Sequence, residues 1–149
     1  MDGQKKLYRV RAVDSTDSAL LEALDEDHCA RLGVSAGVTV GSASFHARTG
    51  HSFIAEDGGE AVGFILASAI WTGGLPTVRV ERLAGADPGV LTALVDALVK
   101  SAYDAGVYDL LAELPENDTA GRHAFEATMF SRSPSVLLTR TLGSRGQQS

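Results

Sequence analysis

The sequence contains a single cysteine, Cys29, and no apolar run that approaches a membrane span. One thiol cannot close an internal disulfide, complete a four-cysteine zinc site or hold an iron–sulfur cluster unaided. A transmembrane helix needs roughly 20 apolar residues, and residues 1–6 lack the apolar core of a secretion signal. These absences argue against disulfide-stabilised, iron–sulfur and membrane proteins, and they predict a cytoplasmic location.

The sequence has no excess of basic residues. Lys and Arg number 13 against 19 Asp and Glu, which gives a formal net charge of −6. Because polyanions are bound mainly through Lys and Arg, neither nucleic acid nor an anionic membrane is an expected partner. His46 and His51 have no acidic neighbour at metal-ligand spacing, so no metal is expected either.

The length and the apolar content of the chain are those of one globular domain. With 149 residues, 44% of them apolar, the chain can bury a sizeable core without disulfides or metals. It shows no internal repeat, low-complexity tract or interdomain linker. We therefore expect a single domain over residues 1–142 and a flexible tail over residues 143–149.

Apolar periodicity and turn residues predict alternating strands and helices. Apolar and charged residues alternate strictly in 77–83, and Asp57-Gly58-Gly59-Glu60 is typical of a tight hairpin turn. Asp87 and Pro88 are typical of a helix start. The expected strands cover residues 5–13, 53–56, 61–67, 77–83, 107–114 and 135–142. The expected helices cover residues 18–31, 42–47, 88–104 and 118–129, and residues 14–17 supply the cap of the first.

The segment from 77 to 114 has the size of one strand–helix–strand crossover unit, whose two strands lie parallel. The hairpins before it require antiparallel neighbours. The expected fold class is therefore α/β, with a mixed central sheet of about six strands flanked by helices.

This order, in which an antiparallel meander leads into a glycine-containing turn and a helix, resembles the GNAT superfamily of acyl-CoA-dependent N-acetyltransferases. In that family the turn carries Arg/Gln-x-x-Gly-x-Gly/Ala, and its backbone N–H groups hold the CoA pyrophosphate. The motif fits in two registers. Residues 82–87 read Arg-Leu-Ala-Gly-Ala-Asp, which keeps the basic residue and the first glycine but ends in Asp87. Residues 86–91 read Ala-Asp-Pro-Gly-Val-Leu, which keeps a glycine before an aliphatic residue but lacks the Arg and the last small residue. Pro88 lacks an amide hydrogen, and a carboxylate opposes a bound phosphate.

A second motif of the family places an Asn near the end of the fifth strand and a Tyr on the next helix. The matching residues here are Asn117 and Phe125. That Tyr often protonates the departing thiolate, which a phenyl ring cannot do, so water, Tyr103 or Tyr108 is the expected proton donor. The resemblance implies acetyl-CoA as cosubstrate. The residues it implies for binding are Leu83, Gly85, Ala86, Gly89, Val90, Leu91 and Asn117.

Glu81 matches the strand position from which many GNAT members deprotonate the attacking amine, directly or through water. The alternative is a solvent-facing ion pair with a cross-strand arginine. His46 and His51 bracket a loop that often walls the acceptor site in this family, and a histidine can act as a base at neutral pH. The alternative is that His46 and His51 are both ordinary loop residues without a role in catalysis.

Residues 47–53 and 100–108 are also similar to a small bacterial family of uncharacterised GNAT-like proteins. The resemblance implies an N-acetyltransferase in which an amine attacks the thioester directly, with Glu81 and Tyr108 as catalytic residues. The acceptor would be a small-molecule amine or a protein N-terminus, and a homodimer is compatible with the family. The alternative is a binding or regulatory module of the same fold that has lost acetyl transfer. A small oxidoreductase is disfavoured, because the chain lacks a complete Gly-x-Gly-x-x-Gly turn.

Overall fold

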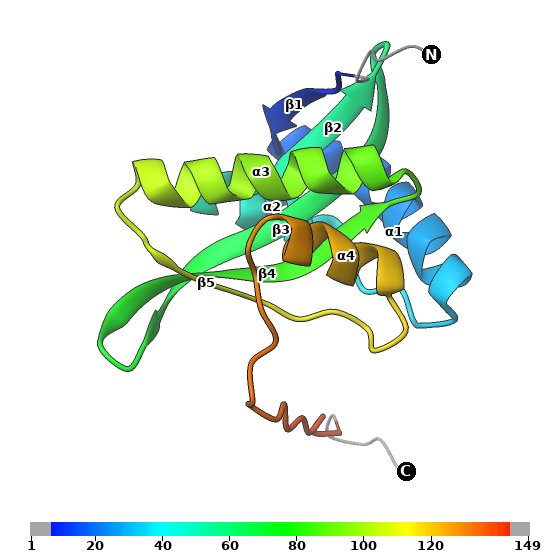
Figure 1. The fold of residues 1–149 in the computed structure, drawn as a ribbon. Helices are drawn as coiled ribbons and strands as arrows, with labels where there is room; N and C mark the ends of the chain where they lie inside the picture. Colours follow the sequence, from blue (N-terminus) through cyan, green and yellow to red (C-terminus); the bar gives the residue numbers. More distant parts are fainter. Residues whose placement is uncertain (1–6, 144–149) are drawn as a thin grey trace.

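A computed structural model describes residues 7–143, in which one five-stranded sheet carries helices on both faces (Figure 1). The strands lie in the sheet in chain order: β1 (Arg9–Ala12), β2 (Phe53–Asp57), β3 (Glu60–Thr72), β4 (Leu75–Gly85) and β5 (Asp109–Ala112). Strands β1 to β4 are antiparallel neighbours, whereas β5 runs parallel to β4. The predicted α/β class, mixed sheet and parallel crossover are confirmed.

Two glycine pairs close the central hairpins. Gly58 and Gly59, between β2 and β3, have φ of 60° and 88°, and Gly73 and Gly74, between β3 and β4, have φ of 59° and 95°. Two successive residues with positive φ form the tight turn whose twist matches that of paired strands, and glycine adopts this conformation without strain. The hairpin turn predicted at Asp57-Gly58-Gly59-Glu60 therefore forms as expected, and Gly73 and Gly74 close a second one.

The helices divide between the two faces of the sheet. They are the short 3₁₀ helix η1 (Ser15–Asp17), α1 (Ser18–Leu32), α2 (Val40–Thr49), α3 (Pro88–Asp104) and α4 (Thr119–Ala127). Helices α1 and α2 cover one face, and α3 and α4 cover the other (Figure 1). Asp87 caps α3 and Pro88 is its first residue, as predicted. All helices within residues 7–143 are too short or too polar to span a bilayer.

The sheet separates two apolar cores. Val78, Val80 and Leu83 of β4 pack with α3 and α4 in the larger core, and Ile54 and Phe64 pack with α1 in the smaller one. A Cβ on Gly63 of β3 would lie 2.6 Å from the Ala84 carbonyl oxygen and 2.6 Å from Val90 Cγ1. Only glycine therefore lets α3 approach the sheet this closely.

Three strand predictions need correction. The strand expected over 135–142 is not formed, because residues 131–143 lie exposed outside the sheet, and β5 covers only Asp109–Ala112 rather than 107–114. A β-type sequence forms a strand only where a neighbouring strand takes up its backbone hydrogen bonds, and within the described residues no strand lies beside residues 135–142, although the outer edge of β5 is open. The strand expected over 5–13 is also shorter, because β1 covers only Arg9–Ala12. Residues 5–6 and most of the expected tail lie outside the described residues.

Candidate functional site

A β-bulge interrupts the pairing of β3 with β4 in the middle of the sheet. Leu66 pairs with Arg82 and Ala67 pairs with Val80, so Glu81 is the extra residue on β4. Val80 and Leu83 consequently face the same core although they are three residues apart. Bulges redirect side chains and are common beside active sites. This bulge leaves the Glu81 side chain exposed at the centre of the sheet.

His46, on α2, is anchored beside this bulge. Its Nδ1 lies 3.2 Å from the Ala67 carbonyl oxygen and 3.2 Å from Ser52 Oγ. The Ser52 hydroxyl itself donates to the same carbonyl at 3.0 Å and accepts from the Ala67 N–H at 2.9 Å. Because both neighbours of Nδ1 act as acceptors, Nδ1 carries the hydrogen, and Nε2 keeps its lone pair.

The electrostatics of His46 suit a base. The side chain is 7% exposed, and this burial lowers the pKa of His46, whereas the Ala67 carbonyl and the Glu81 carboxylate act in the opposite direction. The imidazole is therefore neutral at pH 7, and the nearby Glu81 charge favours the imidazolium once a proton arrives. Within residues 7–143, Nε2 of His46 makes no hydrogen bond. It is not among the fully buried, unpaired side-chain nitrogens of that part of the chain, which belong to His28 and Arg79, so it retains some contact with solvent.

The turn between β4 and α3 already holds an anion of its own chain. Oδ1 of Asp87 accepts a hydrogen bond from the Gly89 N–H at 2.8 Å, and the Tyr8 hydroxyl donates to Oδ2 at 2.8 Å. The N–H groups of Val90 and Leu91 donate to the Asp87 carbonyl at 3.0 and 3.2 Å. The Asp87 carboxylate is thus the N-cap of α3, and it occupies the Gly89 N–H, one of the donors that the resemblance assigns to a phosphate.

A cavity of about 620 Å³ opens beside this turn. Its lining includes Tyr8, Asp87 and Asp96. Like charges repel by about 1 kcal/mol at 4 Å even in bulk water, so the two carboxylates oppose any added anion. A pyrophosphate therefore fits this turn only in place of the Asp87 carboxylate.

Arg82, the basic residue of the predicted motif, is directed at α1. Its Nε lies 3.1 Å from Asp25 Oδ1, and its Nη1 lies 3.6 Å from Cys29 Sγ. Oδ2 of the buried Asp25 accepts hydrogen bonds from the N–H groups of Gly37 and Val38 at 2.9 and 3.0 Å. Arg82 therefore helps to hold the segment between α1 and α2 against β4, and it does not line the α3 turn.

The side chains of several other residues predicted to bind the cosubstrate pack or form hydrogen bonds within the protein. Leu83 is buried in the larger core, and the Asn117 side chain donates to the Leu32 carbonyl at the end of α1 at 2.8 Å. A Cβ on Gly85 would lie 3.1 Å from Val90 Cγ1 and 3.2 Å from Leu91 Cδ2. Of the predicted set, Gly85, Ala86, Gly89, Val90 and Leu91 lie together at the turn, and Asn117 contacts α1 instead.

The structure does not bring Tyr108 to Glu81. Asp109 pairs with Thr77, which places Tyr108 beside the start of β4, about 13 Å along the strand from the bulge. The exposed rings of Tyr103 and Tyr108 contact each other with centroids 5.8 Å apart. Phe125 is buried against Phe130. Since Tyr8, the third tyrosine of the sequence, donates to Asp87, no tyrosine accompanies Glu81.

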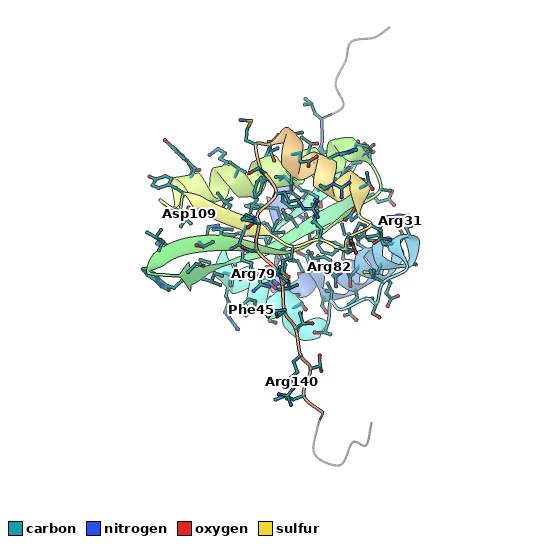
Figure 2. All side chains as sticks on the ribbon, turned by 60° about the horizontal axis from the view of Figure 1, so that its bottom comes forward. Arg31, Phe45, Arg79, Arg82, Asp109 and Arg140 are labelled. Carbon is teal, nitrogen blue, oxygen red and sulfur yellow. The ribbon has the colours of Figure 1, made fainter. Side chains whose placement is uncertain are left out.

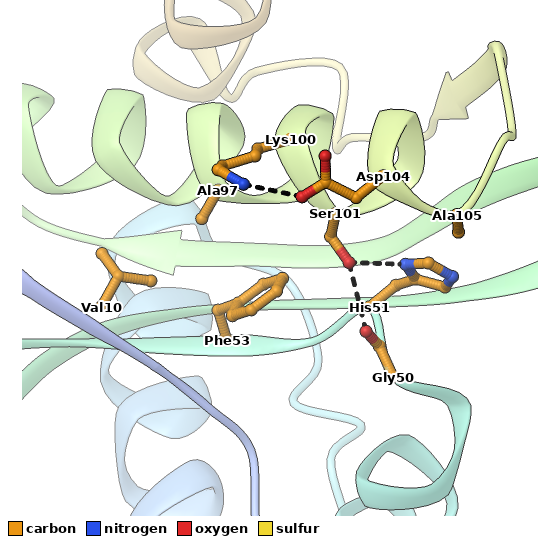
Figure 3. Close-up of a pocket in the computed structure, with 9 residues that line it drawn as sticks. All are labelled: Val10, Gly50, His51, Phe53, Ala97, Lys100, Ser101, Asp104 and Ala105. Atoms are coloured by element: carbon orange, nitrogen blue, oxygen red, sulfur yellow. Dashed lines mark hydrogen bonds and ion pairs between the residues drawn. The ribbon is translucent and has the colours of Figure 1, made fainter.

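A cavity of about 590 Å³ lies between the β1–β2 edge and the second half of α3 (Figure 3). His51 Nδ1 lies 2.9 Å from Ser101 Oγ there, and the Ser101 hydroxyl donates to the Gly50 carbonyl at 3.2 Å. Because that hydrogen is committed to Gly50, Ser101 accepts from His51 and is not activated as a nucleophile. The contact instead joins residues 47–53 to residues 100–108, the two stretches that share the second sequence resemblance.

Sequence reasoning missed Ser52 and Tyr8. Ser52 fixes the tautomer of His46, and Tyr8 fixes the carboxylate of Asp87. Neither residue stands in a motif, and Tyr8 is 79 residues from its partner. No local pattern in the sequence could have identified either contact.

The family follows from a match over almost the whole chain. The model of the family described as protein of unknown function (DUF1999) matches residues 9–148. The chain belongs to the DUF1999 family. The wild-type TTHA1254 structure from Thermus thermophilus is 41% identical to this DUF1999 chain, with 92% of this chain and 99% of that one covered and a TM-score of 0.78. A comparison with curated proteins finds no match.

More distant structures share the fold of this DUF1999 chain. A ribosomal-protein-alanine N-acetyltransferase from Brucella melitensis biovar Abortus 2308 is 17% identical, with 92% and 100% of the two chains covered and a TM-score of 0.71. A predicted acetyltransferase with acetyl-CoA from Clostridium acetobutylicum is 14% identical, with 90% and 96% covered and a TM-score of 0.72. At such identities the likeness shows the fold, and the expected GNAT fold is confirmed.

Proposed function

We propose that this DUF1999 chain transfers an acyl group from a CoA thioester to an amine, with His46 and Glu81 handling the proton of the amine. The observation that carries the proposal is the position of His46: its Nδ1 is held on the carbonyl of Ala67, and Ala67 pairs with Val80, the residue next to Glu81 at the β4 bulge. An alkylamine is protonated at pH 7 and becomes a nucleophile only after it loses that proton. A base at the centre of the sheet would remove this proton.

The two side chains have different tasks in the proposed reaction. His46 accepts the proton at Nε2, because Nδ1 is held as a donor by the Ala67 carbonyl and Ser52. Glu81 stabilises the imidazolium by its charge. Since burial lowers the pKa of His46, the imidazolium then returns its proton readily to solvent. No covalent intermediate on the protein is required, so the amine attacks the thioester directly.

A CoA thioester would supply the acyl group, and its thiolate would leave and take a proton from water, because no tyrosine accompanies Glu81. The turn from Gly85 to Leu91 would hold its pyrophosphate, because an anion, the Asp87 carboxylate, already occupies the Gly89 N–H there. The N-cap contributes only about 1 kcal/mol, so a doubly charged group can displace it. Asp87 is therefore expected to limit the affinity for CoA.

Thermal-shift titration with CoA and acetyl-CoA, followed by assay of thiol release with a panel of amines, tests the proposed function. A ligand at 100 times its Kd should raise the free energy of unfolding by about 2.7 kcal/mol. We expect stabilisation by both compounds and amine-dependent thiol release. An unchanged melting temperature at millimolar ligand, both in the natural chain and in the Asp87→Ser variant, would contradict acyl transfer from CoA.

A binding or regulatory module that has lost acetyl transfer is the second candidate. It is favoured by the Asp87 carboxylate bound to Gly89 and by the buried Phe125 in the place of the family tyrosine. Stabilisation by acetyl-CoA without thiol release for any amine would support this candidate over the enzyme.

Replacement of Asp87 by serine should tighten CoA binding about tenfold, because it removes one negative charge within a few ångströms of the pyrophosphate while keeping a neutral cap. Isothermal titration calorimetry with CoA measures the change. Asp96→Ser is the matched control, since Asp96 lines the same cavity but does not bind the Gly89 N–H. Equal effects of the two substitutions, or weaker binding by Asp87→Ser, would show that the pyrophosphate does not use the cap.

A further inference from the structure

The C-terminal segment over residues 135–142 is apolar and leaves the body of the protein (Figure 1). Val136 is 80% exposed, Leu137 62%, Leu138 87% and Leu142 72%. Aliphatic and β-branched side chains of this kind favour strands that pack on a core. So much apolar surface on one extended segment indicates a contact with another surface.

Local contacts turn this segment away from its own sheet. Phe130 packs against Phe125 with ring centroids 4.9 Å apart, and its N–H donates to the Phe125 carbonyl at 3.0 Å. After Pro134, the Ser135 N–H donates to Ser133 Oγ at 3.2 Å, and the two hydroxyls lie 2.9 Å apart. The segment is therefore fixed where it begins and extends outward from there (Figure 1).

Strand β5 leaves an open edge on the sheet. Within residues 7–143, β5 pairs with β4 on one side, and no strand pairs with the backbone N–H and C=O groups on its other side. Leu110 and Ala112 pack onto the larger core, whereas Leu111 is on the opposite face, in register with Arg79, which pairs with Glu113. An unpaired edge with an apolar face is a template for another strand.

We propose that the segment 135–142 of a second copy of this chain pairs antiparallel with β5, and that the reciprocal exchange forms a two-fold dimer. Each chain carries one exposed segment and one open strand edge, so in a pair of chains each segment can pair with the β5 edge of the other chain. Figure 2 shows that Arg140 lies well apart from Asp109 of its own chain. The segment thus lies away from its own β5, and in the proposed dimer it reaches the β5 edge of the second copy.

Charge fixes the register of the exchanged strand. An antiparallel pairing that sets Arg140 of the partner subunit opposite Asp109 joins a cation to an anion. The same register sets Leu138 of the partner subunit opposite Leu111, and Leu137 opposite Ala112 on the core side. Apolar side chains then cover both faces of the edge. The dimer does not depend on the proposed acyl transfer.

Disulfide formation in the variant Leu111→Cys/Leu138→Cys tests the exchange. Directly paired residues of an antiparallel ladder have Cα atoms about 4.5 to 5.5 Å apart, within the range that a disulfide bridges. We expect mild oxidation to give a covalent dimer on a non-reducing denaturing gel. Cys29 is buried and should not contribute. Leu138→Cys combined with Glu26→Cys, at an exposed position on α1, is the matched control and should not cross-link efficiently.

The mass of the protein in solution gives an independent readout. Light scattering should give about twice the chain mass of 15.6 kDa for the full sequence and the monomer mass for a chain that ends at Pro134. Arg140→Asp should weaken the dimer about tenfold, and adding Asp109→Arg should restore it. A disulfide closed within one chain, or a monomeric and uncross-linked double-cysteine variant, would overturn the proposal. If the chain that ends at Pro134 aggregates, the cross-linking of the double-cysteine variant alone tests the exchange.

Discussion

Replacement of His46 by asparagine is expected to lower kcat by about 10²- to 10⁴-fold, the usual contribution of a general base. The asparagine amide can still donate to the Ala67 carbonyl as Nδ1 does, so the anchor of α2 on β3 survives. Only the basic Nε2 is lost. Steady-state thiol release measures the change, with circular dichroism as the check on folding.

His51→Asn is the matched control for this prediction. His51 is also buried, and its Nδ1 also bonds a hydroxyl, but it faces Ser101 in the cavity beside α3. We expect that variant to keep its kcat within about twofold. Equal losses in the two variants would show that His46 matters only for folding, and an active His46→Asn protein would exclude it as the base.

The pH profile tests the role of Glu81. Burial lowers the pKa of His46, so kcat/KM should stay constant through neutral pH and fall only below the ordinary histidine pKa of about 6.5. Glu81→Gln removes a charge that raises this pKa, so the acid limb should move to still lower pH while the maximal rate falls. A Glu81 that serves only as a surface residue would leave the limb in place.

Replacement of Asp25 by alanine is expected to lower the free energy of unfolding by about 3 to 5 kcal/mol, the cost of breaking a buried ion pair from one side. The side chain is 1% exposed, and it binds Arg82 and the N–H groups of Gly37 and Val38. Alanine would leave a half-buried guanidinium without its counter-charge and two amides without an acceptor. Urea unfolding measures the loss, which should also lower Tm by about 10 °C.

Asp27→Ala provides the comparison on the same helix. Asp27 also pairs with an arginine, Arg31, but its side chain is 71% exposed. Exposed pairs of this kind contribute well under about 1 kcal/mol, so this variant should unfold almost like the natural chain. A small loss for Asp25→Ala, similar to that for Asp27→Ala, would mean that the segment between α1 and α2 is held by apolar packing alone.

Local sequence patterns determined much of the fold. The Gly58-Gly59 turn, the Asp87-Pro88 start of α3 and the parallel crossover all form as predicted. Each depends on residues that are neighbours in the chain, since φ preferences, caps and periodicity act over a few positions. Alternation along β4 and the family resemblance also singled out Glu81, although not the bulge that exposes it.

The tertiary structure alone decided which of the candidate residues meet. It placed His46 beside Glu81 and bound Asp87 to Tyr8, whereas it turned Arg82 toward Asp25 and away from the α3 turn. It also left residues 135–142 outside the sheet despite their strand-like sequence. The sequence by itself determined the order of the helices and strands up to α4, because caps, turns and periodicity are local, but it did not determine whether residues 135–142 find a neighbouring strand. The packing of α1, α2 and α3 on the sheet decided the chemistry, because the partners of a side chain are set by contacts between distant parts of the chain.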